Sequence, residues 1–251
     1  MKKIEDVIIF DRVKKSYKIP GFLKNKEKTA IDNISFSVHR GEFVGLIGLN
    51  GAGKTTIMKI ICGLIKPDSG SVSIFGKDLK TSDVLYKSLI GYLPELPYFY
   101  PHMTAYDTLR FYYMISTKKF DLKKIKETLN IVGLGGKEQE KVKNFSKGMM
   151  QKLGIACAII HEPEIIVMDE PASGLDPLSI KEIRSLLLRL NSEGKTIFIS
   201  SHSISEVEKM CQRVMLIHKG KILETFLIND LNGKNLEEIF IERVLNEDKN
   251  H

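Results

Sequence analysis

A glycine-rich segment between an apolar run and a helical pattern constrains this chain more than any other feature. Residues 48–55 read GLNGAGKT and fill every fixed position of the pattern G-x-x-x-x-G-K-[ST]. The run Glu42–Gly48 is almost continuously apolar, which predicts a strand buried on both faces of a sheet. Thr55–Leu64 has helical spacing. Strand, loop and helix in this order predict a phosphate-binding P-loop, and an ordinary glycine-rich turn is the alternative.

The chemistry of such a loop suits phosphates. Its glycines let the backbone wrap an anion, so that several N–H groups and the positive end of the helix dipole face it. Lys54 would bridge the terminal phosphates, and Thr55 would offer its hydroxyl to Mg²⁺. The expected nucleotide-binding residues of this segment are Gly48, Leu49, Asn50, Gly51, Ala52, Gly53, Lys54, Thr55 and Thr56.

A second apolar run, Ile165–Met168, ends in the two carboxylates Asp169 and Glu170. With a P-loop in the same chain, this pattern is typical of a Walker B strand. Asp169 would hold Mg²⁺ directly or through water, and Glu170 would polarise the attacking water. Phosphoryl transfer depends on positioning and charge neutralisation, which acids at a strand end can supply. The alternative is a pair of solvent-facing acids that only mark the end of the strand.

Strand and helix patterns alternate along the chain, with one interruption. Between about Met103 and Ala158 only helical periodicity is present, so an all-helical insertion divides an α/β fold. The predicted strands are Val7–Val13, Ile34–Val38, Glu42–Gly48, Ser71–Phe75, Leu89–Leu93, Ile165–Met168, Thr196–Ser200 and Val214–His218. The predicted helices are Thr55–Leu64, Tyr106–Ile115, Leu122–Leu134, Lys147–Ile160, Leu178–Leu190, Ile204–Met210 and Leu236–Leu245. A loop containing Pro20, Gly21 and Asn25 is expected between the first two strands.

The charge balance bears on possible partners. The 251 residues include 38 Lys and Arg against 31 Asp and Glu, a formal net charge of +7. The lysines are mixed with acids, and no stripe of aromatic and basic residues is present, so we expect no nucleic-acid partner. Two interpretations remain, a solvated basic surface and a surface that favours anionic lipid headgroups or acidic partner loops.

Other sequence features indicate the compartment. No run approaches the roughly 18 apolar residues that a bilayer crossing needs, and the first residues do not resemble a secretory signal. Cys62, Cys157 and Cys211 lie far apart without metal or redox spacing, which suits reduced, buried cytosolic thiols. We therefore expect a soluble intracellular chain.

A third motif distinguishes among P-loop proteins. A GTPase would carry Asn-Lys-x-Asp after the P-loop, but the only similar string, at residues 25–28, precedes it and lacks the Asp. Small-molecule kinases usually lack a helical insertion with a further motif just before the acidic strand. This chain has such a motif, Asn144–Gln151, at the start of a predicted helix.

On these motifs the chain resembles the nucleotide-binding subunit of ATP-binding-cassette (ABC) transporters over about residues 7–226. That family carries a Leu-Ser-Gly-Gly-Gln signature here, of which this chain keeps Ser146 and Gly148. Lys147 and Met149 depart from the commonest form, and similar substitutions occur in the drug- and antibiotic-export branch. The resemblance implies that Ser146 and neighbouring N–H groups bind the γ-phosphate of an ATP held by an opposite subunit. Alone, the string Ser-Lys-Gly would be a plain helix cap.

The resemblance also assigns roles to four isolated residues. Glu95 stands where the family usually has a Gln that links Mg²⁺ to the helical insertion; an exposed turn acid is the alternative. Asp176 belongs to a loop that runs along the dimer interface. His202 matches the histidine that contacts the γ-phosphate. Tyr17 matches the aromatic residue that stacks on adenine, and a tyrosine used only for packing is the alternative.

The resemblance implies an architecture: a P-loop NTPase core sheet, an antiparallel β portion and an inserted α-helical lobe at about 103–158. We expect an ABC ATPase domain over residues 1–226 and a helical tail over 227–251. Two copies would sandwich ATP and Mg²⁺ head to tail and drive export through a separate integral membrane permease, so the chain would lie peripherally on the cytoplasmic face of the cell membrane.

Two other kinds of protein are alternatives. The first is a soluble ABC ATPase that acts on nucleic acid, ribosomes or cofactor assembly. Its translation-associated members generally carry two cassettes in one chain, and its repair members carry a long coiled-coil insertion. The second is a binding-only module, which the intact Lys54, Asp169, Glu170 and His202 disfavour.

Overall fold

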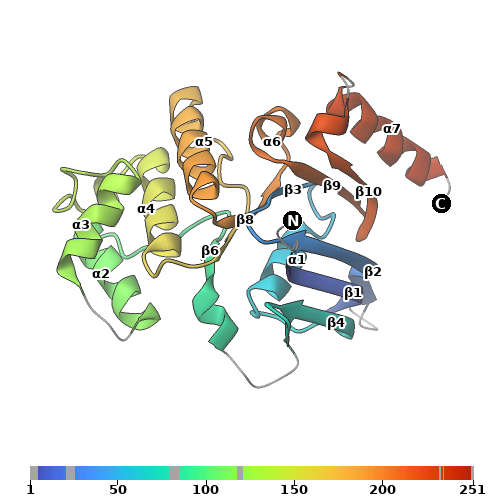
Figure 1. The fold of residues 1–251 in the computed structure, drawn as a ribbon, viewed down its shortest axis with the longest axis horizontal. Coiled ribbons are helices and arrows are strands. Elements are labelled where there is room, and N and C mark those ends of the chain that lie inside the picture. The colour runs from blue at the N-terminus through green and yellow to red at the C-terminus, as the bar shows by residue number, and fades with distance from the viewer. Residues whose placement is uncertain are drawn as a thin grey trace.

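Two sheets and a helical lobe make up the computed structural model, which describes residues 5–20, 26–79, 85–117, 121–231, 233 and 235–249 (Figure 1). In the described part, an antiparallel sheet has the order β2-β1-β4-β5, with β1 Asp6–Ile19, β2 Lys26–His39, β4 Ser69–Ile74 and β5 Lys77–Asp78. A larger sheet has the order β10-β9-β3-β8-β7-β6. Its strands are β3 Phe43–Ile47, β6 Ile90–Leu93, β7 Ile165–Met168, β8 Thr196–Ser201, β9 Arg213–His218 and β10 Lys221–Leu227. The pairs of this sheet are parallel except for β9 with β10.

The central strand β3 shows how the core is divided. Every residue of β3 is buried, and its side chains alternate between two apolar clusters. Phe43 and Ile47 join the cluster that contains α5, α6 and the helical lobe. Val44 and Leu46 join the cluster beneath the antiparallel sheet, together with α1. The apolar run before the P-loop is therefore a strand covered on both faces, as predicted.

Helices cover the larger sheet and form the lobe. Outside the lobe the structure describes α1 Lys54–Ile61, α5 Pro177–Ser192, α6 Ile204–Met210 and α7 Leu236–Lys249. The lobe contains α2 Ala105–Ser116, α3 Leu122–Ile131 and α4 Lys147–Ile159, at the left of Figure 1. Short 3₁₀ turns lie at Leu85–Leu89, Val142–Asn144 and Ile228–Leu231. No helix of the described residues is long and apolar enough to cross a bilayer.

The lobe's helices begin where their sequence predicts. Thr104 accepts a hydrogen bond from the Asp107 N–H at the start of α2, and Asp121 accepts one from the Lys123 N–H at the start of α3. The α/β class, the antiparallel portion and the inserted lobe are confirmed.

Two hairpins extend beyond the predicted strands. β1 and β2 continue well past Val13 and before Ile34, through polar residues that pair across the two strands. β10 was not predicted. It follows the turn Lys219-Gly220, in which both residues have positive φ and which reverses the chain from β9. Backbone hydrogen bonds hold these segments as strands although they lack a continuous apolar pattern. The pattern of apolar residues in the sequence therefore did not predict them. Gly21 and Asn25 of the expected loop lie outside the described residues.

The carboxyl-terminal helix packs against the rest of the molecule. The buried side chains of Leu236, Phe240 and Val244 belong to the same apolar cluster as α5 and α6. Polar contacts join α7 to β9 and β10: His218 with Asp248 at 2.9 Å, Lys221 with Glu247 at 3.1 Å and Arg243 with Glu224 at 2.5 Å. A division at residue 226 stays a prediction, and in this structure β10 runs through that position.

Candidate functional site

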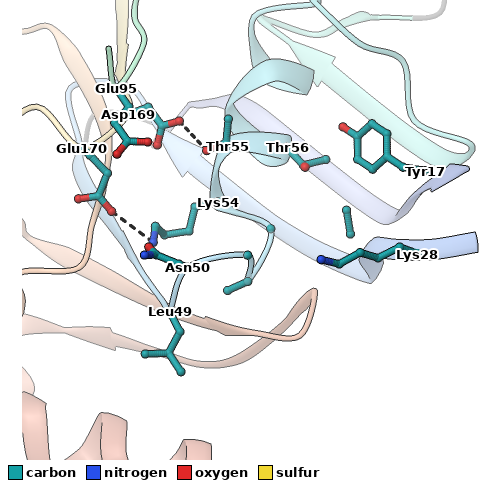
Figure 2. A pocket seen from close by; sticks show the side chains of 14 residues that line it. Tyr17, Lys28, Leu49, Asn50, Lys54, Thr55, Thr56, Glu95, Asp169 and Glu170 are labelled. Carbon is teal, nitrogen blue, oxygen red and sulfur yellow. Dashed lines mark hydrogen bonds and ion pairs between the residues drawn. The ribbon is translucent and has the colours of Figure 1, made fainter. Parts of the chain in front are cut away.

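A cavity of about 410 Å³ opens beside the P-loop, with side chains from both sheets around it (Figure 2). Most of the predicted nucleotide-site residues line it. These are Tyr17, Leu49, Asn50, Gly51, Ala52, Gly53, Lys54, Thr55, Thr56, Glu95, Asp169 and Glu170. Lys28 and Ala30 of β2 also line it and were not predicted.

The P-loop has the backbone geometry that its glycines permit. Gly53 precedes α1 with φ +114°, a conformation that favours glycine, and no side chain of the described residues caps the helix there. The first N–H groups of α1 are therefore open to an anion. Gly48 sits against β9, where a Cβ atom would lie 2.4 Å from the Ile217 carbonyl oxygen. A side chain at position 48 would push the loop away from the sheet.

Two contacts hold Lys54 in place. Its ammonium Nζ donates to the Gly48 carbonyl oxygen at 2.7 Å and lies 3.2 Å from Oε1 of Glu170. Both charged side chains are only 7% exposed. A buried cation and a buried carboxylate thus neutralise each other at the floor of the cavity.

Asp169 is fixed from two sides. Its Oδ2 accepts a hydrogen bond from the Thr55 hydroxyl at 2.6 Å, and its Oδ1 accepts one from the Ser200 hydroxyl at 2.5 Å. The Ser200 oxygen in turn accepts from the Glu170 N–H at 2.9 Å. Ser200 is fully buried and joins β8 to the paired acids, but the sequence reasoning gave it no role. Its signal is a hydroxyl near the end of an apolar parallel strand, where the ends of neighbouring strands meet.

Glu170 is turned into the site by an unusual backbone. Its φ is +50°, in the left-handed region that non-glycine residues seldom occupy. Its Oε2 lies 2.7 Å from Nδ1 of His202 and accepts a hydrogen bond from the His202 N–H at 3.2 Å. The His202 side chain itself is 57% exposed. The predicted histidine therefore holds the Glu170 carboxylate from its solvent-exposed side.

The donor atoms suit Mg²⁺. The Thr55 hydroxyl and the Asp169 carboxylate are adjacent, and Glu95 lines the same cavity beside Asp169 (Figure 2). These are hard oxygen ligands of the kind that Mg²⁺ prefers. In the described parts of the chain, no three His, Cys, Asp or Glu side chains form a metal site by themselves. Phosphate oxygens of a nucleotide and water would have to complete the coordination.

Tyr17 stands at the other end of the cavity. Its ring is 40% exposed, and Nζ of Lys15 lies 5.8 Å from the ring centroid. Asp68 anchors Lys15 through a 2.7 Å ion pair. Hydrogen bonds from Lys15 and from the Ser16 N–H lower the pKa of Asp68 below its ordinary value. The exposed ring is available for stacking on a planar base.

The signature residues lie elsewhere. Ser146 caps α4 and accepts a hydrogen bond from the Met149 N–H at 3.2 Å. Asp176 caps α5 and accepts from the N–H groups of Leu178 and Ser179 and from the Ser179 hydroxyl. These bonds lower the pKa of Asp176, led by the one from the Ser179 hydroxyl.

The starts of α4 and α5 lie against each other. A Cβ atom on Gly148 would lie 2.6 Å from Oγ of Ser179, so glycine permits this close approach. The structure brings Ser146, Gly148 and Asp176 together at this edge, but none of them lines the P-loop cavity. Gly48 and His202 are also absent from its lining, although each bonds a residue that does line it.

Comparison with known proteins agrees with this geometry. A family model described as ABC transporter matches residues 31–173. The bacitracin transport ATP-binding protein BcrA of Bacillus licheniformis is 42% identical over 82% of this chain and 67% of its own length. The lantibiotic transport ATP-binding protein SrtF of Streptococcus pyogenes is 39% identical over 87% of this chain and 93% of its own.

Solved structures show the same fold. One described as the ATP-binding subunit of an ABC transporter has a TM-score of 0.81 and 30% identity, covering 94% of this chain and 99% of its own. The dimeric structure of a bacterial ABC transporter cassette has a TM-score of 0.80 and 26% identity, covering 88% and 98%.

Proposed function

The chain belongs to the ABC transporter family as an ATP-binding subunit, and we propose that two head-to-tail copies hydrolyse ATP to drive export through a separate permease. One observation carries the catalytic part of this proposal. A single cavity contains a buried ammonium, two buried carboxylates and the open amino-terminus of a helix. These groups bind phosphates, coordinate a cation and activate water.

The ion pair of Lys54 with Glu170 suggests how the γ-phosphate would act on the site. Nζ of Lys54 lies 3.2 Å from Oε1 of Glu170. The γ-phosphate would compete for the Lys54 ammonium, which frees the Glu170 carboxylate to accept a proton from the attacking water. His202 keeps that carboxylate oriented through its N–H and Nδ1. Mg²⁺, held by Thr55 and Asp169 and reached by Glu95, would neutralise charge on the phosphates.

The position of Ser146 supports the dimer. It is an exposed cap at the start of α4 and does not line the cavity of its own chain. A second copy placed head to tail would bring its Ser146, Gly148 and Asp176 to the open side of the cavity. A relative of the same fold is described as dimeric, which supports a pair of copies.

An apolar surface on the lobe suits a membrane partner. Phe111, Met114 and Ile115 of α2 are 47%, 56% and 66% exposed and recur at helical spacing on one face. Tyr98 and Tyr100, on the segment between β6 and α2, are 82% and 66% exposed. Exposed apolar groups gathered in this way mark interaction surfaces.

The same segment begins near Glu95, so it connects the lobe surface to the nucleotide cavity. A permease seated on the lobe would therefore be coupled to the occupancy of the site. In this arrangement the chain binds peripherally on the cytoplasmic face of the membrane.

The catalytic proposal is tested by phosphate release from ATP with the purified chain. We expect release that requires Mg²⁺ and that falls about a thousandfold in Glu170→Gln. Glu164→Gln is the matched control, because Glu164 precedes the same strand at its opposite end, where it pairs with Arg40. Equal loss in both variants, or turnover that persists in Glu170→Gln, would reject the assignment of Glu170.

The transport proposal has a separate test. The chain is co-expressed with each membrane protein encoded beside it, and the membrane fraction is purified in detergent through a tag on the membrane protein. We expect the chain to co-purify with one of them, and replacing Met114 and Ile115 by Asp to release it. Absence from every such preparation would favour an ABC ATPase without a membrane partner.

A further inference from the structure

Lys28 is a cation in the nucleotide cavity to which the sequence motifs give no role. It lies on β2, where its cross-strand partner is Tyr17. Directly opposed residues of an antiparallel pair project from the same face of the sheet. Lys28 therefore shares the face of the proposed adenine-stacking ring. Figure 2 shows its side chain directed from β2 toward the P-loop.

The strand that carries Lys28 abuts the P-loop directly. A Cβ atom on Gly53 would lie 2.5 Å from the Ala30 carbonyl oxygen, so β2 and the loop are in close contact two residues from Lys28. The register shifts at this point, because Lys15 pairs with Ile31 whereas Ser16 pairs with Thr29. The extra residue, Ala30, forms a bulge that lies against the loop. Lys28 is thus placed between Tyr17 and the start of α1.

Lys28 differs from the neighbouring lysines Lys15 and Lys54 in its ion partners. Lys15 is paired with Asp68, and Lys54 is paired with Glu170. Lys28 is exposed, and among the described residues no acidic side chain forms an ion pair with it. An unneutralised ammonium at the wall of a phosphate site attracts an anion.

We propose that Lys28 contacts the α-phosphate of the bound nucleotide. The inference rests on the proposed ATP site. The P-loop N–H groups cradle the α- and β-phosphates, Lys54 reaches the β- and γ-phosphates and Tyr17 takes the base, so the ribose and the α-phosphate are the parts of the nucleotide that lie between Tyr17 and Lys54. Of these two, only the phosphate is charged. Lys28 therefore adds affinity to nucleotides whatever their number of phosphates and takes no part in bond cleavage.

The experiment measures binding by isothermal titration calorimetry and turnover by phosphate release. We expect Lys28→Gln to weaken AMP, ADP and ATP by the same factor, about fivefold, and to leave adenosine unchanged. The Michaelis constant for ATP should rise by that factor while kcat stays constant, because the contact is equal in ground and transition states. High salt should reduce the difference, and Lys28→Arg should restore binding.

Lys18→Gln is the matched control. Lys18 is exposed on β1 next to Tyr17, projects from the opposite face and does not line the cavity. Lys18→Gln removes the same charge as Lys28→Gln, so a general electrostatic effect on nucleotide binding would appear in both variants. Equal affinities in Lys28→Gln and the wild type, equal loss in Lys18→Gln, or weakened adenosine binding would each overturn the inference. Failure of the wild type to bind ATP or ADP would instead reject the proposed function itself.

Discussion

The P-loop edge and the signature edge of this molecule are built in opposite ways. At the P-loop edge, the half-buried Thr55 of α1 and the buried Asp169 after β7 and Ser200 of β8 bond one another. At the signature edge, Ser146 and Asp176 are exposed and bond only the first turn of their own helices or its side chains. One edge is a complete pocket and the other is a preformed surface. Under the proposed function, one chain loads the site and a second chain completes it.

Lys54→Ala should have the largest effect on turnover, because it removes the buried ammonium group of the P-loop edge. We expect ATP turnover to fall at least a hundredfold, with weaker nucleotide binding, since no other buried cation lines the cavity in the described residues. Lys59→Ala, an exposed lysine of the same helix, is the control and should keep wild-type turnover. Because the change also leaves Glu170 buried without its ion partner, thermal unfolding must be measured beside turnover. Turnover that survives in a folded variant would contradict the P-loop assignment.

Ser146→Arg should affect the signature edge and leave the P-loop edge unchanged. A bulky cation at the start of α4 would block the approach of a phosphate held by another chain. We expect turnover to fall about tenfold or more while ATP binding to the monomer stays unchanged, because Ser146 does not line the cavity. Ser185→Arg, at an exposed position of α5, controls for the added charge. Loss of monomer binding in Ser146→Arg would show that the edges are not independent.

Ser200→Ala tests the side-chain hydrogen bonds within the P-loop edge. The substitution leaves the Glu170 N–H and one oxygen of Asp169 without their buried partner. We expect the free energy of unfolding to fall by about 1–3 kcal/mol and turnover to fall severalfold. Ser192→Ala, whose hydroxyl bonds the Arg189 carbonyl at the exposed end of α5, should change stability by much less. Equal stability losses would mean that the Ser200 bridge contributes little.

Tyr17→Ala should have the smallest effect of the set. Loss of the ring should weaken ATP binding about threefold to tenfold, whereas Tyr17→Phe should retain it, because the stacking face and not the hydroxyl is used. Competition by GTP should improve relative to ATP if the ring selects adenine. Wild-type affinity in Tyr17→Ala would leave the residue with a packing role only.

Sequence patterns predicted the motif residues of the P-loop edge better than the residues that surround and position them. The motif around Lys54 and the pair of acids after Met168 are each a contiguous stretch of sequence, so a local pattern is enough to locate them. Lys28 and Ser200 reach the same site through strand pairing, Lys28 opposite Tyr17 and Ser200 opposite Leu46, and no contiguous motif marks either residue. Strand β10 was missed for a related reason. It is specified by the turn with positive φ at Lys219 and by backbone pairing with β9 more than by apolar alternation.

In the proposed function, ATP joins two copies of the chain through the signature surface. Glu170→Gln tests it most directly, because it stops hydrolysis and leaves the phosphate-binding groups in place. Its mass in solution is measured by light scattering during gel filtration without nucleotide, with ADP and with ATP. The account predicts a monomer in the first two conditions and a dimer with ATP, which adding Ser146→Arg abolishes. A variant that binds ATP at saturation and still elutes as a monomer would contradict it.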